Sequence, residues 1–126
     1  MTREILYVFF GAGIGGVIRM LLGRAALNAF GAGFPFGTMG INITGSFFIG
    51  IAATLLTKDG THHNFVQYFV MVGILGGYTT FSSFSLETLR LMEHGQAPQA
   101  LLYVALSVLL GFTAVFIGMA ISKPLL

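Results

Sequence analysis

The chain has 126 residues, of which 56% are hydrophobic and only 8% charged, and its formal net charge is +2. These proportions, with a mean hydropathy of +0.90, lie far outside the range of soluble domains and indicate an integral membrane protein. The charge balance is too small to favour a nucleic acid partner. The absence of cysteine excludes disulfides, iron–sulfur clusters and thiolate catalysis.

Four apolar stretches predict an all-α membrane protein with one transmembrane domain spanning residues 1–126. The expected helices cover residues 4–28, 34–57, 65–92 and 97–122. Each is long enough to cross a hydrocarbon core roughly 30 Å thick. A cleaved signal peptide is the alternative for the first stretch, but that stretch continues past Arg19 and three more follow it.

The first span contains a glycine-rich run and an arginine. Residues 11–16 match a dinucleotide fingerprint, but that fold needs an acidic residue about twenty positions later, and residues 31–40 contain none. We therefore interpret these glycines as a surface for close helix packing. Charge is costly inside a membrane, so Arg19 is expected to reach the far interface or to line an aqueous vestibule.

The second span places polar residues on one helical face. Thr38, Asn42 and, roughly, Gly45 follow a helical repeat. An intramembrane Asn can join two helices by a hydrogen bond, and its amide can also donate to an ion. The sequence leaves both interpretations of Asn42 open.

The third span carries the most informative pattern, a run of six hydroxyl side chains and a glycine pair at residues 76–85. At about 1.5 Å per residue, the glycines lie roughly 16 Å into the span, near mid-membrane. Polar or broken backbone is tolerated there only where protein or a water-filled path surrounds it. We therefore expect a break near Gly76–Thr80 and a permeation or ion-binding site.

Two aromatic residues follow that glycine pair. Phe81 and Phe84 are three residues apart and share a helical face. Because ring edges carry positive potential, Phe edges beside hydroxyl donors suit a small dehydrated anion. Glu87 is the one acid well inside a span, and Arg90 at i+3 could form a structural ion pair with it.

The fourth span and the loops add weaker signals. Tyr103 and Ser107 lie a helical repeat apart and could continue a polar stripe, and Thr113 follows. The three histidines are in loops or at a helix end with no ligand set at metal spacing, so we interpret them as solvated residues: His62, His63 and His94.

The distribution of cations predicts insertion in both orientations. The count is three against three, with one side holding Arg3, Lys58 and Lys123 and the other holding Arg19, Arg24 and Arg90. Four helices also enclose too little interior to line a selective path. We therefore expect an antiparallel dimer of eight helices.

These motifs together resemble the Fluc (CrcB) family of fluoride channels, small four-helix proteins that assemble as antiparallel dimers. The resemblance rests on Gly15-x-x-x-Arg19, on Gly37-Thr38-x-x-x-Asn42 and on the long run from Gly76 to Glu87. It implies a passive, fluoride-selective channel, not an enzyme, that exports fluoride from the cell across the inner membrane and relieves its toxicity. The implied partners are the lipid bilayer, fluoride and a second inverted copy or a paralogous subunit.

The resemblance also implies roles for individual residues. Asn42 would contact fluoride through its amide, Phe81 and Phe84 would form an aromatic box, and Arg19 would belong to the vestibule. The carbonyls of Gly76 and Thr79 would hold one structural sodium ion at the dimer centre. The other side chains implied in the fluoride pathway are Thr38, Thr80, Ser82, Ser83, Tyr103 and Ser107.

The fourth span departs from the family pattern. Related sequences commonly carry Gly-Ser-x-x-x-Thr, whereas this chain has Phe112 and Phe116 at the two hydroxyl positions. Thr113 could substitute, the track could be dispensable, or the chain could form one half of a heterodimer.

A small, dual-topology, proton-coupled multidrug transporter is the alternative function, since such proteins share the helix number and the inverted dimer. It would need a carboxylate that exchanges protons and drug, and Glu87 beside Arg90 is the one candidate. An enzyme is less favoured, because no nucleophile and base lie together in the sequence.

Overall fold

The computed structural model describes residues 1–58 and 60–125 and consists of long helices in an antiparallel arrangement. The four spans are α1 (Thr2–Phe30), α2 (Phe36–Lys58), a composite third span from Phe65 to Glu93, and α5 (Ala97–Leu125). Each span is long and apolar enough to cross a membrane. The predicted all-α class with four membrane spans agrees with this architecture.

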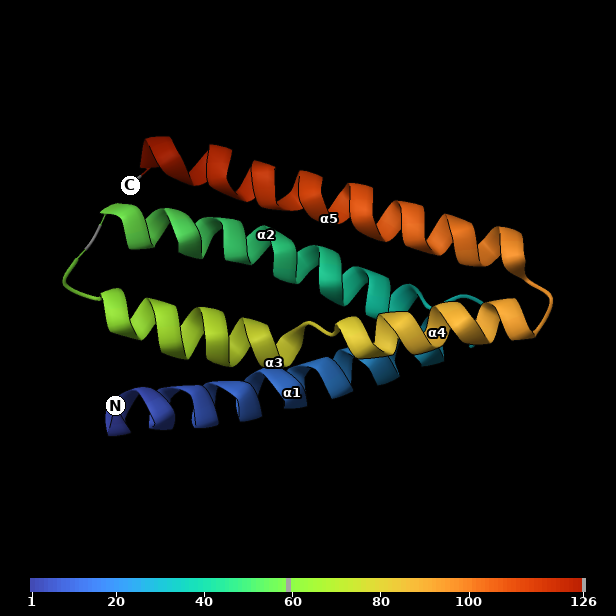
Figure 1. The fold of residues 1–126 in the computed structure, drawn as a ribbon, viewed down its shortest axis with the longest axis horizontal. Coiled ribbons are helices and arrows are strands. Elements are labelled where there is room, and N and C mark those ends of the chain that lie inside the picture. Colours follow the sequence, from blue (N-terminus) through green and yellow to red (C-terminus); the bar gives the residue numbers. More distant parts are fainter. Residues whose placement is uncertain (59, 126) are drawn as a thin grey trace.

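The spans pack as two neighbouring pairs (Figure 1). In one pair α1 runs beside the third span, and in the other α2 runs beside α5. Both chain ends lie at the same end of the bundle, as expected for an even number of spans. The second pair covers one side of the third span, since α2 also contacts it.

Glycines let α1 approach the third span closely. A Cβ atom on Gly15 would overlap the Ile74 carbonyl and lie 2.8 Å from the Tyr78 nitrogen, and one on Gly77 would lie 2.5 Å from the Ala12 oxygen. Real Cβ atoms do not come that near to backbone, so no larger residue fits without moving a helix. The small-residue packing predicted for the first span is therefore present.

The second pair uses the same packing device. A Cβ on Gly50 of α2 would overlap the Val115 carbonyl and lie 3.1 Å from the Met119 nitrogen, and one on Gly118 of α5 would overlap the Phe47 carbonyl. In a bilayer, where lipid tails are as apolar as the helices, close backbone contact of this kind drives helix association.

The third span is not a regular α-helix. It begins as the π-helical segment η1 (Phe65–Leu75), continues as α3 (Gly76–Tyr78), becomes extended at Thr79 and Thr80, and resumes as α4 (Phe81–Glu93). The Gly76 N–H donates to the Met71 carbonyl five residues earlier, the π-type spacing. The extended residues have φ and ψ of −82° and 158° at Thr79 and −153° and 114° at Thr80.

The interruption therefore follows the glycine pair rather than coinciding with it. Gly76 is helical, with φ of −64° and ψ of −39°, and α3 includes Gly77. The interruption lies within the expected range Gly76–Thr80, at Thr79 and Thr80 rather than at the glycine pair. Gly77 is instead needed for contact with α1 at Ala12, and the threonines carry the extended backbone.

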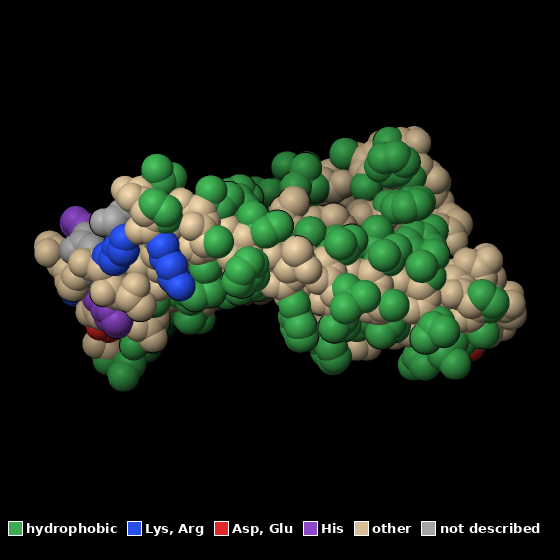
Figure 2. Space-filling model, turned by 90° about the horizontal axis from the view of Figure 1, so that it is seen from above, with side chains coloured by type: hydrophobic (Ala, Val, Ile, Leu, Met, Phe, Trp, Pro, Cys, Tyr) green, Lys and Arg blue, Asp and Glu red, His purple; other side chains and the backbone are tan. Residues whose placement is uncertain are grey.

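The exterior is apolar along the spans (Figure 2). Hydrophobic side chains cover much of the face shown, and Lys, Arg and His side chains gather near one end of it. Among the described residues the largest fully buried side chain is Tyr103, so the interior is small. A surface of this kind suits lipid or a second protein chain, not water.

Candidate ion pathway around the third span

Asn42 of α2 holds the extended residue Thr80 from two sides. Its Nδ2 atom donates to the Thr80 carbonyl at 3.1 Å, and its Oδ1 atom accepts from the Thr80 N–H at 2.8 Å. The amide thus replaces helical bonds that an extended residue cannot make within its own span. One of the two amide hydrogens is used in this way, and the second remains for another acceptor.

The carbonyls around the interruption fall into two groups. Gly77 accepts from Arg19 Nε at 3.1 Å, and Thr80 accepts from Asn42. In a continuous helix the Gly76 carbonyl would accept from the Thr80 N–H, and the Thr79 carbonyl would accept from the Ser83 N–H. Here the Thr80 N–H donates to Asn42 instead, and the Ser83 N–H donates to the Thr80 hydroxyl at 3.2 Å. Gly76 and Thr79 thereby lose their i+4 donors.

These two residues line an open cavity of about 290 Å³ on the bundle surface. The same cavity is lined by Asn42 and Phe81. Backbone oxygens without helical donors, next to an open cavity, can accept hydrogen bonds from water or coordinate a hard cation.

The two aromatic residues of α4 differ strongly in exposure. Their ring centroids are 5.8 Å apart with a 47° angle between planes. Phe81 is 79% exposed beside the cavity, whereas Phe84 packs against the buried Tyr103 ring at 5.1 Å. The Thr80 and Ser82 hydroxyls lie 3.3 Å apart at the start of α4. Ring edges and hydroxyl groups therefore share the first turn of this helix.

Glu87 lies farther along α4 and accepts from two other spans. The Thr38 hydroxyl donates to its Oε1 atom at 2.7 Å, and the Tyr103 hydroxyl donates to its Oε2 atom at 2.8 Å. Among the described residues no ion pair joins Glu87 to Arg90, the i+3 pair that the sequence left open. The hydroxyl donors from α2 and α5 reach the carboxylate instead, which links three spans.

Two members of this triad, Thr38 and Glu87, line a second cavity of about 580 Å³. Its walls come from the end of α1, the connection to α2, the first turn of α2, and the last turns of α4. Thr38, Glu87 and Arg90 line it, but Arg19 does not. The Arg19 side chain instead donates to the Gly77 carbonyl from Nε.

The comparisons with known proteins now decide the family. The family model described as CrcB-like protein, Camphor Resistance (CrcB), matches residues 6–119. The chain belongs to the CrcB family.

Several curated relatives of this CrcB chain carry the name fluoride-specific ion channel FluC. The one from Rhizobium meliloti (strain 1021) is 42% identical over 98% of both chains. The one from Sphingopyxis alaskensis is 45% identical, also over 98% of both chains. The one from Ruegeria sp. (strain TM1040) is 43% identical over 100% of this chain and 99% of its own.

The residues of α5 that the sequence analysis singled out differ in their surroundings. Phe112 and Phe116 of α5 are 75% and 71% exposed, and the Thr113 hydroxyl donates to the Leu109 carbonyl of its own helix at 2.7 Å. Ser107 is different, because its hydroxyl oxygen is buried and has no protein partner among the described residues. Ser107 therefore retains a free donor, and Thr113 uses its hydrogen within the helix.

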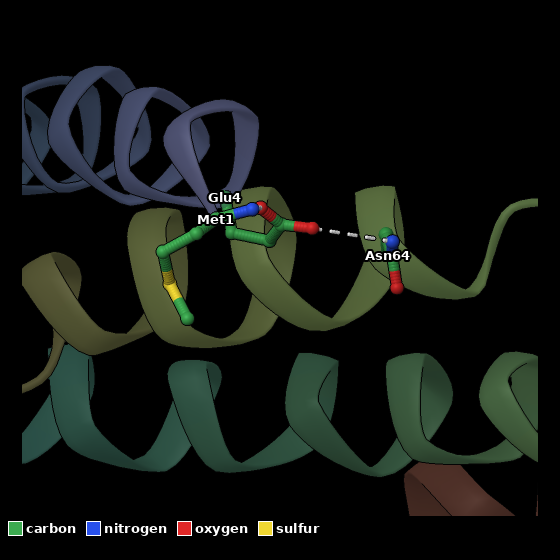
Figure 3. Close-up of polar contacts among 3 residues, drawn as sticks. All are labelled: Met1, Glu4 and Asn64. Carbon is green, nitrogen blue, oxygen red and sulfur yellow. Dashed lines mark hydrogen bonds and ion pairs between the residues drawn. The ribbon is translucent and has the colours of Figure 1, made fainter.

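A separate polar cluster at the end that holds both termini is unrelated to this site (Figure 3). Glu4 accepts from Asn64 at 3.5 Å and pairs with the Met1 amino group at 2.5 Å. The described residues contain no group of three or more His, Cys, Asp or Glu side chains that could hold a metal ion. The cluster joins α1 to the start of the third span.

Sequence reasoning identified the polar residues but missed their partners. Neither the donation from Thr38 and Tyr103 to Glu87 nor the bond from Arg19 to Gly77 was anticipated. The signal was present in part, since Thr38 and Tyr103 are polar residues inside apolar spans and need partners there.

Proposed function

We propose that this protein is a passive, fluoride-selective ion channel that exports fluoride and relieves its toxicity. The observation that carries the proposal is its membership of the CrcB family, with relatives named fluoride-specific ion channels that match nearly its whole length. A channel requires a path for an anion and no reacting centre, which agrees with the prediction that the chain is not an enzyme.

The local chemistry supports an anion of small size. Fluoride must lose water to pass mid-membrane, and hydroxyl donors, the free hydrogen of the Asn42 amide and the ring edges of Phe81 and Phe84 can replace that water. The proposed path runs along these groups and continues past Ser83 to Thr38, Tyr103 and Ser107. The Phe81 ring is exposed in the single chain and can face an ion or a second subunit.

The functional unit is proposed to be an antiparallel dimer of two copies, or of this chain and a paralogous subunit. The balanced cation count supports dual insertion. The interruption also opens onto the outer surface of the bundle through the 290 Å³ cavity, and not into its interior. A path along such a surface is enclosed by protein only when a second subunit covers it.

One sodium ion is proposed to lie at the dimer axis, held by the carbonyls of Gly76 and Thr79. These carbonyls are suited to coordinate sodium, because the N–H groups that would bond to them in a helix donate to Asn42 and to the Thr80 hydroxyl instead. Two subunits would supply four such oxygens, and uncompensated carbonyls in a membrane cost several kcal/mol each. A bound cation would neutralise them and would fix the dimer.

The cellular location is proposed to be the inner membrane. Four spans support a multi-pass membrane protein. A channel that exports fluoride from the cytoplasm would have to lie in the membrane that encloses the cytoplasm. The multidrug transporter is not favoured, since both carboxylate oxygens of Glu87 already accept hydrogen bonds from hydroxyl groups.

Fluoride efflux from liposomes containing the purified protein tests the function directly. We expect rapid efflux that needs no proton gradient, and efflux equal to protein-free vesicles would refute a self-sufficient channel. If adding a paralogous subunit then restores efflux, the chain works as half of a heterodimer. If it does not, the proposed function is wrong. Phe81→Ile and Phe84→Ile should fold and assemble but lose most of the flux, because an aliphatic side chain lacks the ring quadrupole.

Two further measurements test the dimer and the ion. A cysteine introduced at Lys123 should be modified from outside intact cells in about half of the molecules if insertion is dual; uniform labelling or uniform protection would contradict this. Replacing all sodium by a large organic cation should dissociate the dimer or stop the flux, and full activity without sodium would argue against the site.

A further inference from the structure

One arginine, Arg90, lines the 580 Å³ cavity. Of the three cations assigned to that side of the membrane, Arg90 lines the cavity, whereas Arg19 and Arg24 do not. Arg19 points to the Gly77 carbonyl. The field inside this cavity is therefore set by Arg90 and by the groups that surround it.

The other charged groups of the cavity would repel an anion. Glu87 lies on the same helix three residues earlier and also lines the wall. Its carboxylate accepts from Thr38 and Tyr103, which spreads its charge but does not cancel it. An anion that approaches Thr38 from solvent must pass near this carboxylate, so a compensating positive charge is needed at the mouth.

The backbone also contributes partial positive charge to the cavity. The first residues of α2, Phe36 to Thr38, line the same cavity, and the start of a helix carries partial positive charge on its free N–H groups. His94 fixes the turn that carries Arg90, because its N–H and its Nδ1–H both donate to the Arg90 carbonyl, at 3.1 and 2.7 Å. The backbone of Arg90 is thus held in the last turn of α4, and Arg90 lines the same cavity as the positive start of α2.

We infer that Arg90 makes this cavity a collecting site for small hydrated anions, and that it offsets Glu87 so that fluoride can enter the path at Thr38. The inference rests on the proposed function for its role in transport. The potential inside the cavity is a property of the cavity alone. A charge on α4 is thereby added to the vestibule charge that the sequence predicted on α1.

The potential of the cavity can be measured without any fluoride flux. Because the chain has no cysteine, a single cysteine at Ala32, an exposed lining residue, can be labelled cleanly in detergent. The readout is the ratio of its reaction rates with an anionic and a cationic thiosulfonate reagent. At an ionic strength of about 0.01 M, adding Arg90→Gln should lower this ratio about tenfold.

Arg24→Gln is the matched control, since it removes the same charge from the same end of the molecule without touching the cavity wall. It should change the ratio less than about twofold, and about 1 M salt should abolish the effect of Arg90→Gln, because the Debye length falls to about 3 Å. An unchanged ratio in Arg90→Gln, or an equal fall in both variants, would overturn the collecting site.

Fluoride efflux then links the site to transport. Arg90→Gln should slow efflux about tenfold at low ionic strength and much less at high ionic strength, while Arg90→Lys should stay near the parent rate. A changed labelling ratio with unchanged efflux would refute the role in transport, and absent efflux in the parent would refute the channel but not the cavity potential.

Discussion

The two helix pairs of this protein use the same packing device and satisfy their polar groups differently. Both α1 with the third span and α2 with α5 meet through glycines at backbone contact. In the second half of α5 the hydroxyls return to their own helix, as Thr113 does to Leu109 and Ser122 to Gly118. In the third span, Gly77 and Thr80 instead receive donors from other helices.

The continuous helices therefore serve as a scaffold, and the interrupted third span forms the candidate site. A continuous apolar helix closes its own hydrogen bonds, so its structure depends on length and packing alone. The interrupted span depends on particular side chains of α1 and α2, and it leaves two carbonyls without helical donors. Substitutions around the interruption should therefore have larger effects than substitutions of similar polarity on α5.

The largest effect is expected for Asn42→Leu. It removes a donor and an acceptor from the Thr80 backbone, and each unsatisfied group costs about 1–3 kcal/mol. We expect fluoride efflux to fall by about a hundredfold or more, since each 1.4 kcal/mol is about tenfold. Asn64→Leu, at the other end of the bundle, is the control and should retain the flux.

Asn42→Asp sharpens this test. The carboxylate keeps an acceptor for the Thr80 N–H but loses the donor and adds negative charge. We expect a folded dimer without fluoride flux, as judged by size-exclusion chromatography and efflux. An active Asn42→Asp protein would show that fluoride passes without a hydrogen bond from this amide.

Next in size is the effect of Gly15→Ala on stability. The added Cβ would overlap the Ile74 carbonyl, whereas a Cβ on Gly13 would meet nothing within 4 Å. We expect a loss of about 1–3 kcal/mol or more for Gly15→Ala and little change for Gly13→Ala. Thermal unfolding in detergent measures both, and equal stability would contradict the close contact of α1 with the third span.

A smaller effect is expected for Arg19→Lys. Lysine keeps the positive charge but lacks the planar donor group that reaches the Gly77 carbonyl. A hydrogen bond to a charged group contributes about 1.5–3 kcal/mol, so we expect efflux to fall about tenfold. Arg24→Lys should have no such effect, and a parent-like rate in Arg19→Lys would show that charge alone matters.

The smallest effect is expected for Thr113→Val on α5. Its hydroxyl is exposed and bonds within its own helix, and surface substitutions of this kind usually change stability by less than about 0.5 kcal/mol. Efflux within about twofold of the parent is the expected result. A tenfold loss would instead show that Thr113 replaces the hydroxyls absent at Phe112 and Phe116.

Much of the architecture followed from the sequence alone. Apolar runs separated by short breaks determine four spans, because a bilayer accepts only segments whose backbone groups are bonded internally. The glycine spacing determined which faces pack. The run from Gly76 to Glu87 located the unusual segment and its family, since no ordinary span gathers hydroxyls, glycines and aromatics at mid-membrane.

The tertiary structure decided which groups complete that segment. The sequence located the break only to the range Gly76–Thr80 and left open an ion pair between Glu87 and Arg90, because local spacing favours neighbours on one helix. In the fold, Asn42 bonds to Thr80, Arg19 bonds to Gly77, and Thr38 with Tyr103 bonds to Glu87. Each pair comes from different spans, and their meeting depends on helix packing that no local pattern encodes.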